Sequence, residues 1–384
     1  MHSLDAFAQA KLEALTSRSL RRTLAATERA DALWVRRDGR RLLSFSCNDY
    51  LNLSQHPDVK RAAMAAIERY GVGAGASRLV TGNHPLYAEL EGRLARLKGS
   101  EAAVVFGSGY LANSGIVPAL VGAEGLVLID ELAHACLFAG AHLSRSKVLV
   151  FRHNDVAHCR ALLQEHRRAH ERALILTDGV FSMDGDLAPL AELDAVAAAH
   201  DAWLMADDAH GLGVVGGGRG SSFANGKHVP LPLQMGTLSK AVGGYGGYLC
   251  ASAPVIELMR NRARTLIYST GLPPSVVAAA IAAIDIIESQ PDYCVLPVRK
   301  ARAFTSALGL SEAQSPIVPI VIGDEEKTLA ASRLLMESGF LAAAIRPPSV
   351  PAGTARLRLT FTAQHPEEEI VRLAHIVRTQ ILPS

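Results

Sequence analysis

Lys240 lies in a stretch of small residues, Gly236–Gly247, and is preceded by Thr237 and Ser239. A lysine amine that is partly desolvated has a lowered pKa and can form a Schiff base with a carbonyl compound. The two neighbouring hydroxyl groups could bind a phosphate. The stretch is not a P-loop, because no Lys-Ser or Lys-Thr pair follows a glycine at the required spacing. A solvated lysine in a glycine turn is the alternative, and the residues upstream argue against it.

A carboxylate pair, Asp207 and Asp208, follows an apolar run of strand length and precedes His210. Open α/β sheets bind their ligands at the C-terminal ends of strands. A buried carboxylate there could pair with the protonated ring nitrogen of pyridoxal phosphate and make this cofactor an electron sink. Metal binding is the alternative, but neighbouring side chains on a strand point to opposite faces. The sequence therefore favours a pyridine cofactor and no metal site.

Gly107, Gly109 and Ala112 follow another apolar run and open a probable helix. The free N–H groups of a helix N-terminus bind phosphate well. With Asp130 at the end of the next strand, these residues also fit the dinucleotide-binding fingerprint in order and spacing. Lys240 favours pyridoxal phosphate, because a dehydrogenase needs no such lysine. An NAD-dependent oxidoreductase remains the alternative from a different enzyme class.

Three further sites carry candidate groups. His134 follows a strand and could lie over a flat ring, although such a histidine is more often structural. Ser182, in a glycine-containing turn after a strand, is a candidate cofactor-facing hydroxyl. Arg356 and Arg358 are two residues apart and share a face of a predicted strand, where either could bind a carboxylate bidentately. An exposed edge strand with basic residues is the alternative.

Apolar runs of strand length alternate with helical segments through the middle of the chain. The runs are Ala102–Phe106, Leu126–Asp130, Lys147–Phe151, Ala173–Thr177 and Ala202–Asp207. This alternation predicts a mostly parallel sheet with helices on both faces. Near residue 285 the alternation ends. We therefore expect an N-terminal helical segment (1–45), a large α/β domain (46–284) and a smaller C-terminal α+β domain (285–384).

The composition is that of a globular enzyme, with 49% hydrophobic and 20% charged residues among 384. The net charge of +2 creates no general attraction for nucleic acid or anionic membranes. The five cysteines have no C-x-x-C spacing, which suits a reducing compartment. No uncharged apolar run reaches about 18 residues, and no signal-peptide pattern is present. A cytoplasmic location is expected, with no nucleic-acid or membrane partner.

Taken together, these residues resemble the α-oxoamine synthase family of pyridoxal-phosphate enzymes, which has the type I aminotransferase-like fold. The resemblance covers nearly the whole chain, from Leu20–Arg22 and Asn48–Leu51 to the C-terminal domain. Within the family, four segments most resemble the members that condense L-alanine with a pimeloyl thioester. These segments are His153–Val156, Gly179–Asp186, Ile267–Thr270 and Ile345–Thr360.

The resemblance implies roles for individual residues. Lys240 would bind pyridoxal phosphate as a Schiff base, Asp207 would pair with the pyridine nitrogen, His210 would contact the ring oxygen, and His134 would stack on the ring. The family works as a homodimer with interface active sites, so Thr270 would approach the phosphate from the partner subunit. The other implied cofactor contacts are Gly109, Tyr110, Ser182 and Thr237, and the implied substrate contacts are Arg21, His134, Ser349, Arg346 and Arg358.

The implied reaction belongs to biotin biosynthesis. The freed Lys240 amine removes the Cα proton of L-alanine as a general base. The resulting carbanion attacks pimeloyl-CoA or a pimeloyl carrier protein, the CoA or carrier leaves, and decarboxylation follows. A sister enzyme that uses glycine or serine, making 2-amino-3-oxobutyrate or 5-aminolevulinate, is the alternative within the family. A non-enzymatic protein that retains the cofactor fold is the alternative outside it.

The chain departs from the usual family pattern at several positions. Asp178 replaces Glu, Asn52 replaces Gly, and Ser349 replaces Thr. Ser retains the hydroxyl group, and Asp retains the carboxylate on a shorter side chain. We therefore expect these replacements to tune the activity and not to abolish it. Ala241-Val242 stands where Gly-Phe is common, which bears on the acyl-chain pocket.

Overall fold

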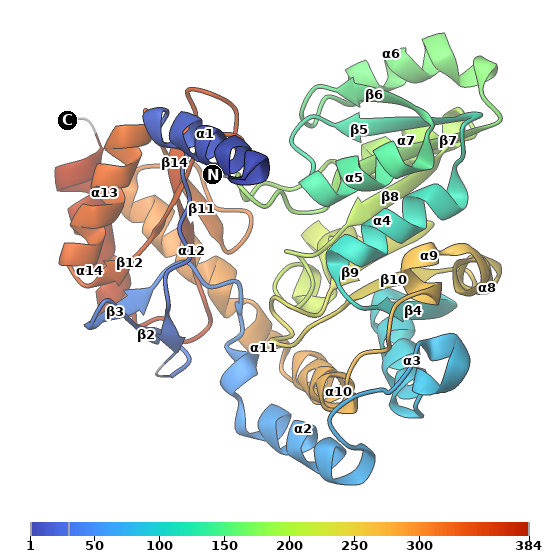
Figure 1. Ribbon diagram of the computed structural model, residues 1–384, viewed down its shortest axis with the longest axis horizontal. Helices are drawn as coiled ribbons and strands as arrows, with labels where there is room; N and C mark the ends of the chain where they lie inside the picture. The colour runs from blue at the N-terminus through green and yellow to red at the C-terminus, as the bar shows by residue number, and fades with distance from the viewer. Residues whose placement is uncertain (1, 30, 383–384) are drawn as a thin grey trace.

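The computed structural model describes residues 2–29 and 31–382 and contains a central seven-stranded sheet (Figure 1). The strand order is β4-β10-β9-β8-β7-β5-β6, and only β10 runs antiparallel to its neighbours. The strands are β4 (Ala102–Phe106), β5 (Gly125–Asp130), β6 (Lys147–Phe151), β7 (Arg172–Asp178), β8 (Trp203–Asp207), β9 (Leu233–Thr237) and β10 (Gly247–Ala251). The predicted mostly parallel α/β sheet is confirmed.

Helices cover both faces of this sheet because its inner strands are apolar on both faces. Alternate residues of β5 and β7 pack into two different cores, Val127 and Leu174 into one, Leu126 and Ile175 into the other. The first core is closed by α4 (Gly109–Leu120), α5 (Ala135–Ser144), α8 (Ala253–Arg262) and α9 (Arg264–Ile267). The second is closed by α6 (Val156–His166) and α7 (Leu190–Ala199).

Strands β9 and β10 were not predicted from the sequence. Their glycines, and the glycine-rich connection between them, hide the apolar alternation that identifies a strand. They pair antiparallel, with Gly247 opposite Thr237, so the stretch around Lys240 is the connection between them. Gly243 and Gly246 in this connection have positive φ values of 74° and 134°, which glycine adopts at low cost. The glycines thus shape the turn that carries Lys240.

The C-terminal part contains a second, antiparallel sheet with the order β11-β14-β13. Its strands are β11 (Ile317–Gly323), β13 (Ala343–Ile345) and β14 (Ala355–Thr360), and its helices are α12 (Leu296–Leu308), α13 (Glu325–Glu337) and α14 (Glu367–Ile376). Their core includes Phe304 and Phe361 together with Phe45 from the N-terminal segment.

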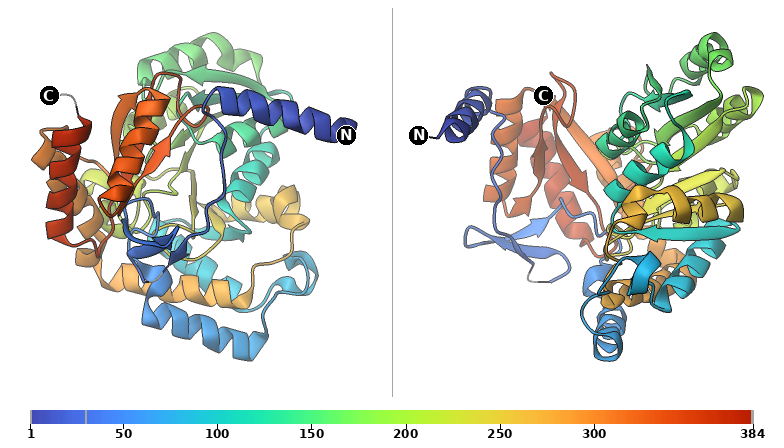
Figure 2. Two further views of the ribbon diagram at one scale, coloured as in Figure 1. Left: turned by 60° about the vertical axis from the view of Figure 1, so that its left-hand side comes forward. Right: turned by 45° about the vertical axis from the view of Figure 1, so that its right-hand side comes forward.

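The N-terminal segment 1–45, expected to be helical, is a helix only in α1 (Ser3–Ser17) among its described residues. Three strands follow, β1 (Glu28–Arg29), β2 (Trp34–Arg37) and β3 (Arg40–Ser44). Strand β3 pairs in parallel with β12 (Phe340–Leu341), which joins this segment to the C-terminal part, as Figure 2 shows. Helix α1 has no buried residue and projects from the C-terminal part.

Three further helices complete the large part: α2 (Pro57–Tyr70), α3 (Leu86–Lys98) and α10 (Pro274–Ser289). The short α11 (Pro291–Cys294) then leads from α10 towards α12 (Figure 1). Across residues 2–29 and 31–382, every helix is too short or too polar to cross a bilayer.

Candidate active site

One cavity of about 200 Å³ lies where the C-terminal ends of β7, β8 and β9 meet the N-terminal ends of α4 and α5. Most of the residues singled out as cofactor contacts line it. They are Gly109, Tyr110, His134, Asp207, His210, Thr237 and Lys240. Ser108, Cys136, Asp178, Ala209 and Ser239 complete the lining.

Asp207 ends β8 and is buried. Its Oδ2 accepts a hydrogen bond from Nδ2 of Asn113 at 2.7 Å, and its Oδ1 accepts one from the backbone N–H of Ala209 at 3.0 Å. The carboxylate is therefore held in one orientation at the cavity wall. Sequence reasoning missed Asn113, although it stands four residues after Gly109 and so lies on the same face of α4.

The Lys240 amine lies 3.4 Å from Oγ1 of Thr237. Burial lowers the pKa of Lys240, while the negative charges of Asp207 and Asp178 act in the opposite direction, and the Arg358 guanidinium lowers it further. The net direction is downwards, so the amine loses its proton at a lower pH than an exposed lysine. This is the property required of a lysine that acts as nucleophile and base.

His134 and Asp178 interact at the start of α5. The backbone N–H of His134 donates to Oδ1 of Asp178 at 3.1 Å, and the imidazole Nδ1 accepts from the N–H of Cys136 at 3.3 Å as the helix N-cap. Burial lowers the pKa of His134, which favours a neutral ring. Burial, and then the charge of Asp207, raise the pKa of Asp178 well above its usual range. The shorter side chain at position 178 thus supports the helix that carries His134.

His210 is buried, and its Nδ1 lies 2.7 Å from the hydroxyl oxygen of Tyr50. Burial lowers the pKa of His210 well below its ordinary value, and the positive charges of Lys240 and Arg358 act in the same direction. The ring is therefore neutral. Tyr50 falls within the segment Asn48–Leu51 of the family resemblance, but its role could not be predicted, because its contact partner lies 160 positions away.

The first turn of α4 can bind an anion. Ser108 caps the helix by accepting from the N–H of Leu111 at 3.2 Å. At Gly109 an added Cβ would lie 2.5 Å from Cγ2 of Thr237, so glycine is required for this helix start to approach β9 so closely. N–H groups at a helix N-terminus, with the Thr237 and Ser239 hydroxyls nearby, form a phosphate-binding arrangement.

The donor set of the cavity therefore fits pyridoxal phosphate. The phosphate would bind at the start of α4 with Thr237. The oriented carboxylate of Asp207 would pair with a protonated ring nitrogen. The amine of Lys240 would form a Schiff base with the carbonyl carbon. These groups meet in one cavity, which no residue pattern along the chain could establish.

The structure places Ser182 and Arg358 beside each other but outside the lining of this cavity. Nε of Arg358, on β14, donates to the backbone oxygen of Ser182, and its Nη1 donates to Oδ1 of Asn48 at 3.1 Å. Arg358 is buried. Arg356, the other arginine of this strand, donates from Nη1 to Oδ1 of Asp184. The edge-strand alternative for these arginines does not hold, because β14 is the central strand of its sheet.

Three other residues of the expected substrate site lie further out. Ser349 and Arg346 line a hollow of about 70 Å³ together with Arg22, whose Nη2 donates to Oγ of Ser349 at 3.1 Å. Arg346 donates to the backbone oxygen of Ser19. Arg21 is exposed. Within one chain these residues are not brought to the cavity that contains Lys240.

Thr270 is also outside the cavity. It is exposed and pairs with Ser77 in an isolated antiparallel bridge. Within one chain, Thr270 therefore cannot serve the cofactor cavity from its observed position.

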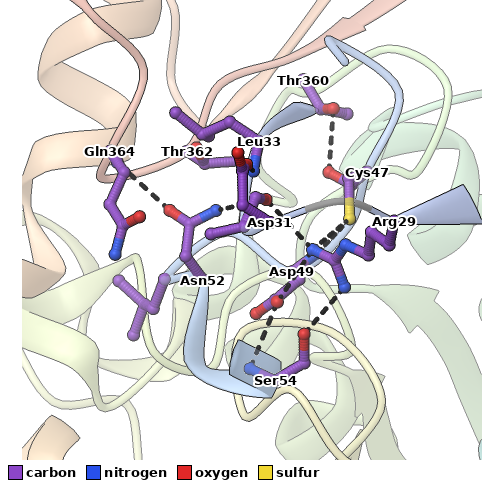
Figure 3. Close-up of polar contacts among 12 residues, drawn as sticks. Arg29, Asp31, Leu33, Cys47, Asp49, Asn52, Ser54, Thr360, Thr362 and Gln364 are labelled. Carbon is purple, nitrogen blue, oxygen red and sulfur yellow. Dashed lines mark hydrogen bonds and ion pairs between the residues drawn. The ribbon is translucent and has the colours of Figure 1, made fainter. Parts of the chain in front are cut away.

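The segment 47–54 lies between the two parts of the molecule, and Figure 3 shows the contacts that hold it. Arg29 donates to Ser54 at 2.7 Å and to Asp49 at 3.1 Å. Asn52 has a left-handed φ of 57°, a conformation that asparagine tolerates better than most residues. Its side chain also accepts from the N–H of Gln364 at 3.1 Å. Asn52 in place of glycine therefore retains the left-handed backbone conformation and adds a side-chain hydrogen bond to Gln364.

The dinucleotide-binding hypothesis is contradicted by the sheet. The strand that precedes Gly107 is β4, at the edge of the sheet, and its one neighbour β10 is antiparallel. In dinucleotide-binding folds this strand lies within a parallel sheet. Asp130, expected to bind a ribose, instead accepts from Nδ1 of His153 at 3.0 Å and from the N–H of Asn154 at 2.8 Å.

Comparison with known proteins agrees with this site. Residues 40–377 match the family model of class I and II aminotransferases. The 8-amino-7-oxononanoate synthase of Beijerinckia indica is 63% identical over 377 residues, 98% of both chains. That of Methylocella silvestris is 68% identical over 344 residues, 90% of this chain and 98% of the relative.

Solved structures show the same fold. A serine palmitoyltransferase from S. paucimobilis, solved with PLP and myriocin bound, has a TM-score of 0.92 at 29% identity and covers 98% of both chains. The 8-amino-7-oxononanoate synthase of Francisella tularensis has a TM-score of 0.76 at 24% identity, covering 88% of this chain and 98% of that one, which is a likeness of fold. The chain belongs to the class I and II aminotransferase family of pyridoxal-phosphate enzymes, in its 8-amino-7-oxononanoate synthase group.

Proposed function

We propose that this enzyme condenses L-alanine with a pimeloyl thioester, from CoA or a carrier protein, and releases CO₂ and 8-amino-7-oxononanoate. The observation that carries the proposal is the meeting of Lys240 and the oriented Asp207 carboxylate in one cavity. The two bacterial relatives compared above, at 63% and 68% identity, have the corresponding name. Pyridoxal phosphate, when bound here, supplies an electron sink for a negative charge on the amino-acid Cα.

Two residues of the chain would control protons at the reacting centre. Asp207, held by Asn113 and Ala209, would keep a proton on the ring nitrogen of the cofactor. The Lys240 amine would accept the Cα proton of the amino acid and later return a proton. Burial lowers the pKa of Lys240, which increases the fraction of free amine near neutral pH.

Arg358 is the proposed site for the amino-acid carboxylate. Its guanidinium is buried, and its positive charge lowers the pKa of Lys240 and of His210. It also has donors suited to a bidentate carboxylate contact. Arg21, Arg346 and Ser349 are proposed to contact the acyl substrate. They lie at or near the outer hollow, where a second positively charged site would suit an acidic acyl chain.

We also propose that the chain works as a homodimer in the cytoplasm, with Thr270 reaching the partner's cofactor. The support is an exposed apolar group around the Ser77–Thr270 bridge: Val72, Leu79, Val80 and Tyr268, each between 59% and 77% exposed. Exposed apolar side chains in one surface region are typical of protein interfaces. The five cysteines are all free, which suits a reducing compartment.

The first experiment is the visible absorption spectrum of the purified protein with pyridoxal phosphate. The wild type should show a Schiff-base band that is absent from Lys240→Ala and retained in Lys227→Ala, a change of an exposed lysine. L-Alanine with pimeloyl-CoA or pimeloyl carrier protein should then give CO₂ and free thiol.

Several outcomes would count against the proposal. Turnover with glycine or serine, and none with L-alanine, would replace this function by that of a sister enzyme. A band that persists in Lys240→Ala would remove the assigned lysine, and a normal band without turnover would favour a non-enzymatic protein.

A further inference from the structure

We infer that Tyr50 is a positioning residue that holds His210 in the tautomer with its proton on Nε2, so that the imidazole presents a hydrogen-bond donor to the cavity. The inference rests on the bound cofactor and not on which amino acid or acyl donor is used.

The contact between the two residues is short and buried. The Tyr50 hydroxyl lies 2.7 Å from Nδ1 of His210, and Tyr50 is completely buried. His210 lines the cavity, and in the described part of the chain Tyr50 is the only hydrogen-bond partner recorded for its ring. A neutral imidazole has one N–H and one acceptor nitrogen, so the direction of this bond decides what the other nitrogen offers. His210 is neutral because burial and nearby cations lower its pKa.

Two observations set the direction. The distance of 2.7 Å is typical of an O–H donor, whereas N–H donors prefer about 2.9–3.0 Å. The competing acceptor for the hydroxyl is Oδ1 of Asn48, at 3.3 Å, which already accepts from Nη1 of Arg358. Because arginine has donors only, this contact also fixes which end of the Asn48 amide faces Tyr50. The hydroxyl therefore donates to Nδ1 of His210, and the ring proton is on Nε2.

The backbone at and around Tyr50 is fixed by the C-terminal part and by the N-terminal segment. Its backbone oxygen accepts from the N–H of Ala363 at 2.8 Å, and the nearby Cys47 oxygen accepts from Oγ1 of Thr360 at 2.9 Å. Figure 3 shows Arg29 bound to the same segment through Cys47 and Asp49. Tyr50 thus links the C-terminal part, which carries Arg358, to the histidine at the cofactor cavity.

The test uses Tyr50→Phe in the protein reconstituted with pyridoxal phosphate. We expect about five-fold weaker cofactor binding, the effect of one neutral hydrogen bond, and a shifted pH midpoint of the visible band. The charged and titratable groups around His210 are Lys240, Arg358 and His134, and they are unchanged in this variant. Tyr248→Phe is the matched control, since Tyr248 is equally buried and its hydroxyl has no hydrogen-bond partner among the described residues.

A double-mutant cycle separates positioning from a general structural effect. In a His210→Asn background, Tyr50→Phe should cause no further loss of cofactor affinity, because Tyr50 acts through the ring. An equal loss in both backgrounds, or no change in Tyr50→Phe alone, would overturn the inference. Nitrogen NMR of the wild-type protein with labelled histidine gives the tautomer without depending on the folding of any Tyr50 variant. The His210 signals are identified by their loss in His210→Asn, and a proton on Nδ1 would equally overturn the inference.

Discussion

Replacing His153 by glutamine should destabilise the protein in a pH-dependent way. The His153 imidazole bridges two carboxylates, with Nδ1 3.0 Å from Asp130 at the end of β5 and Nε2 2.8 Å from Asp186. Burial lowers the pKa of His153, but the hydrogen bonds and charges of the two carboxylates outweigh it and raise the pKa to about 10. The ring is therefore a half-buried cation that attaches the turn 179–187 to the sheet.

The magnitude follows from the linkage between proton binding and stability. The folded chain keeps this proton up to about pH 10, whereas the unfolded chain loses it near 6.5. The stabilisation is thus fully present below pH 6.5 and is lost as the pH rises through about 10. The two values imply an upper limit of about 5 kcal/mol, at about 1.4 kcal/mol per pKa unit. Because the side chains of His153 and Asp186 are 23% and 31% exposed, screening by solvent reduces this to about 2 kcal/mol.

Urea unfolding of wild type and His153→Gln across pH 6 to 11 measures this quantity without adding salt. His153→Gln should be less stable by about 2 kcal/mol near pH 7, and the difference should shrink as the pH rises from about 6.5 and be lost above about pH 10. His142→Gln is the control, because that ring bonds a backbone carbonyl instead of a carboxylate. A difference that stays constant over the whole range would show that His153 contributes packing against Phe181 and no ionic link, and would refute the reasoning.

Two further predictions concern the surroundings of Asp207. Nζ of Lys98 lies 2.7 Å from the neighbouring Asp208, and both side chains are at most 3% exposed, so Lys98→Met should lower stability in urea unfolding by about 3–5 kcal/mol. Lys98→Met combined with Asp208→Asn should recover part of this loss, and equal stability of the single and double variants would contradict an uncompensated charge as the cause. Gly109→Ala should weaken pyridoxal phosphate binding at least about tenfold, because relief of the contact with Thr237 must separate α4 from β9. Gly122→Ala, where an added Cβ meets nothing within 4 Å, should bind the cofactor normally, and the same affinity in both variants would contradict the steric argument.

The large sheet was predictable because its inner strands are apolar on both faces. Five strand-length runs were predicted as strands, and β4 to β8 occupy them within one or two residues. The N-terminal segment was not predictable in the same way. Strand β3 pairs with β12, nearly 300 residues later in the chain, and no local pattern shows such a pairing.

For the site, residue types and order along the chain were enough to select Lys240, Asp207 and Gly109. Asp207 and Gly109 stand at or just after the end of a predicted strand, and Lys240 stands in a glycine-rich stretch beside two hydroxyl residues. The sequence was also enough to indicate pyridoxal phosphate, because only a cofactor with a carbonyl and a basic ring nitrogen uses both the lysine and the carboxylate.

Only the tertiary structure decided which groups orient these residues and which fingerprint was false. Asn113 orients Asp207, and Tyr50 contacts His210, because helices and loops from distant positions converge on the ends of β8 and β9. The glycine pattern at Gly107 does not form a dinucleotide-binding site, because β4 is an edge strand and its neighbour β10 is antiparallel. Strand order, side-chain hydrogen bonds and burial depend on long-range packing, and they set the electrostatic environment that residue types alone do not specify.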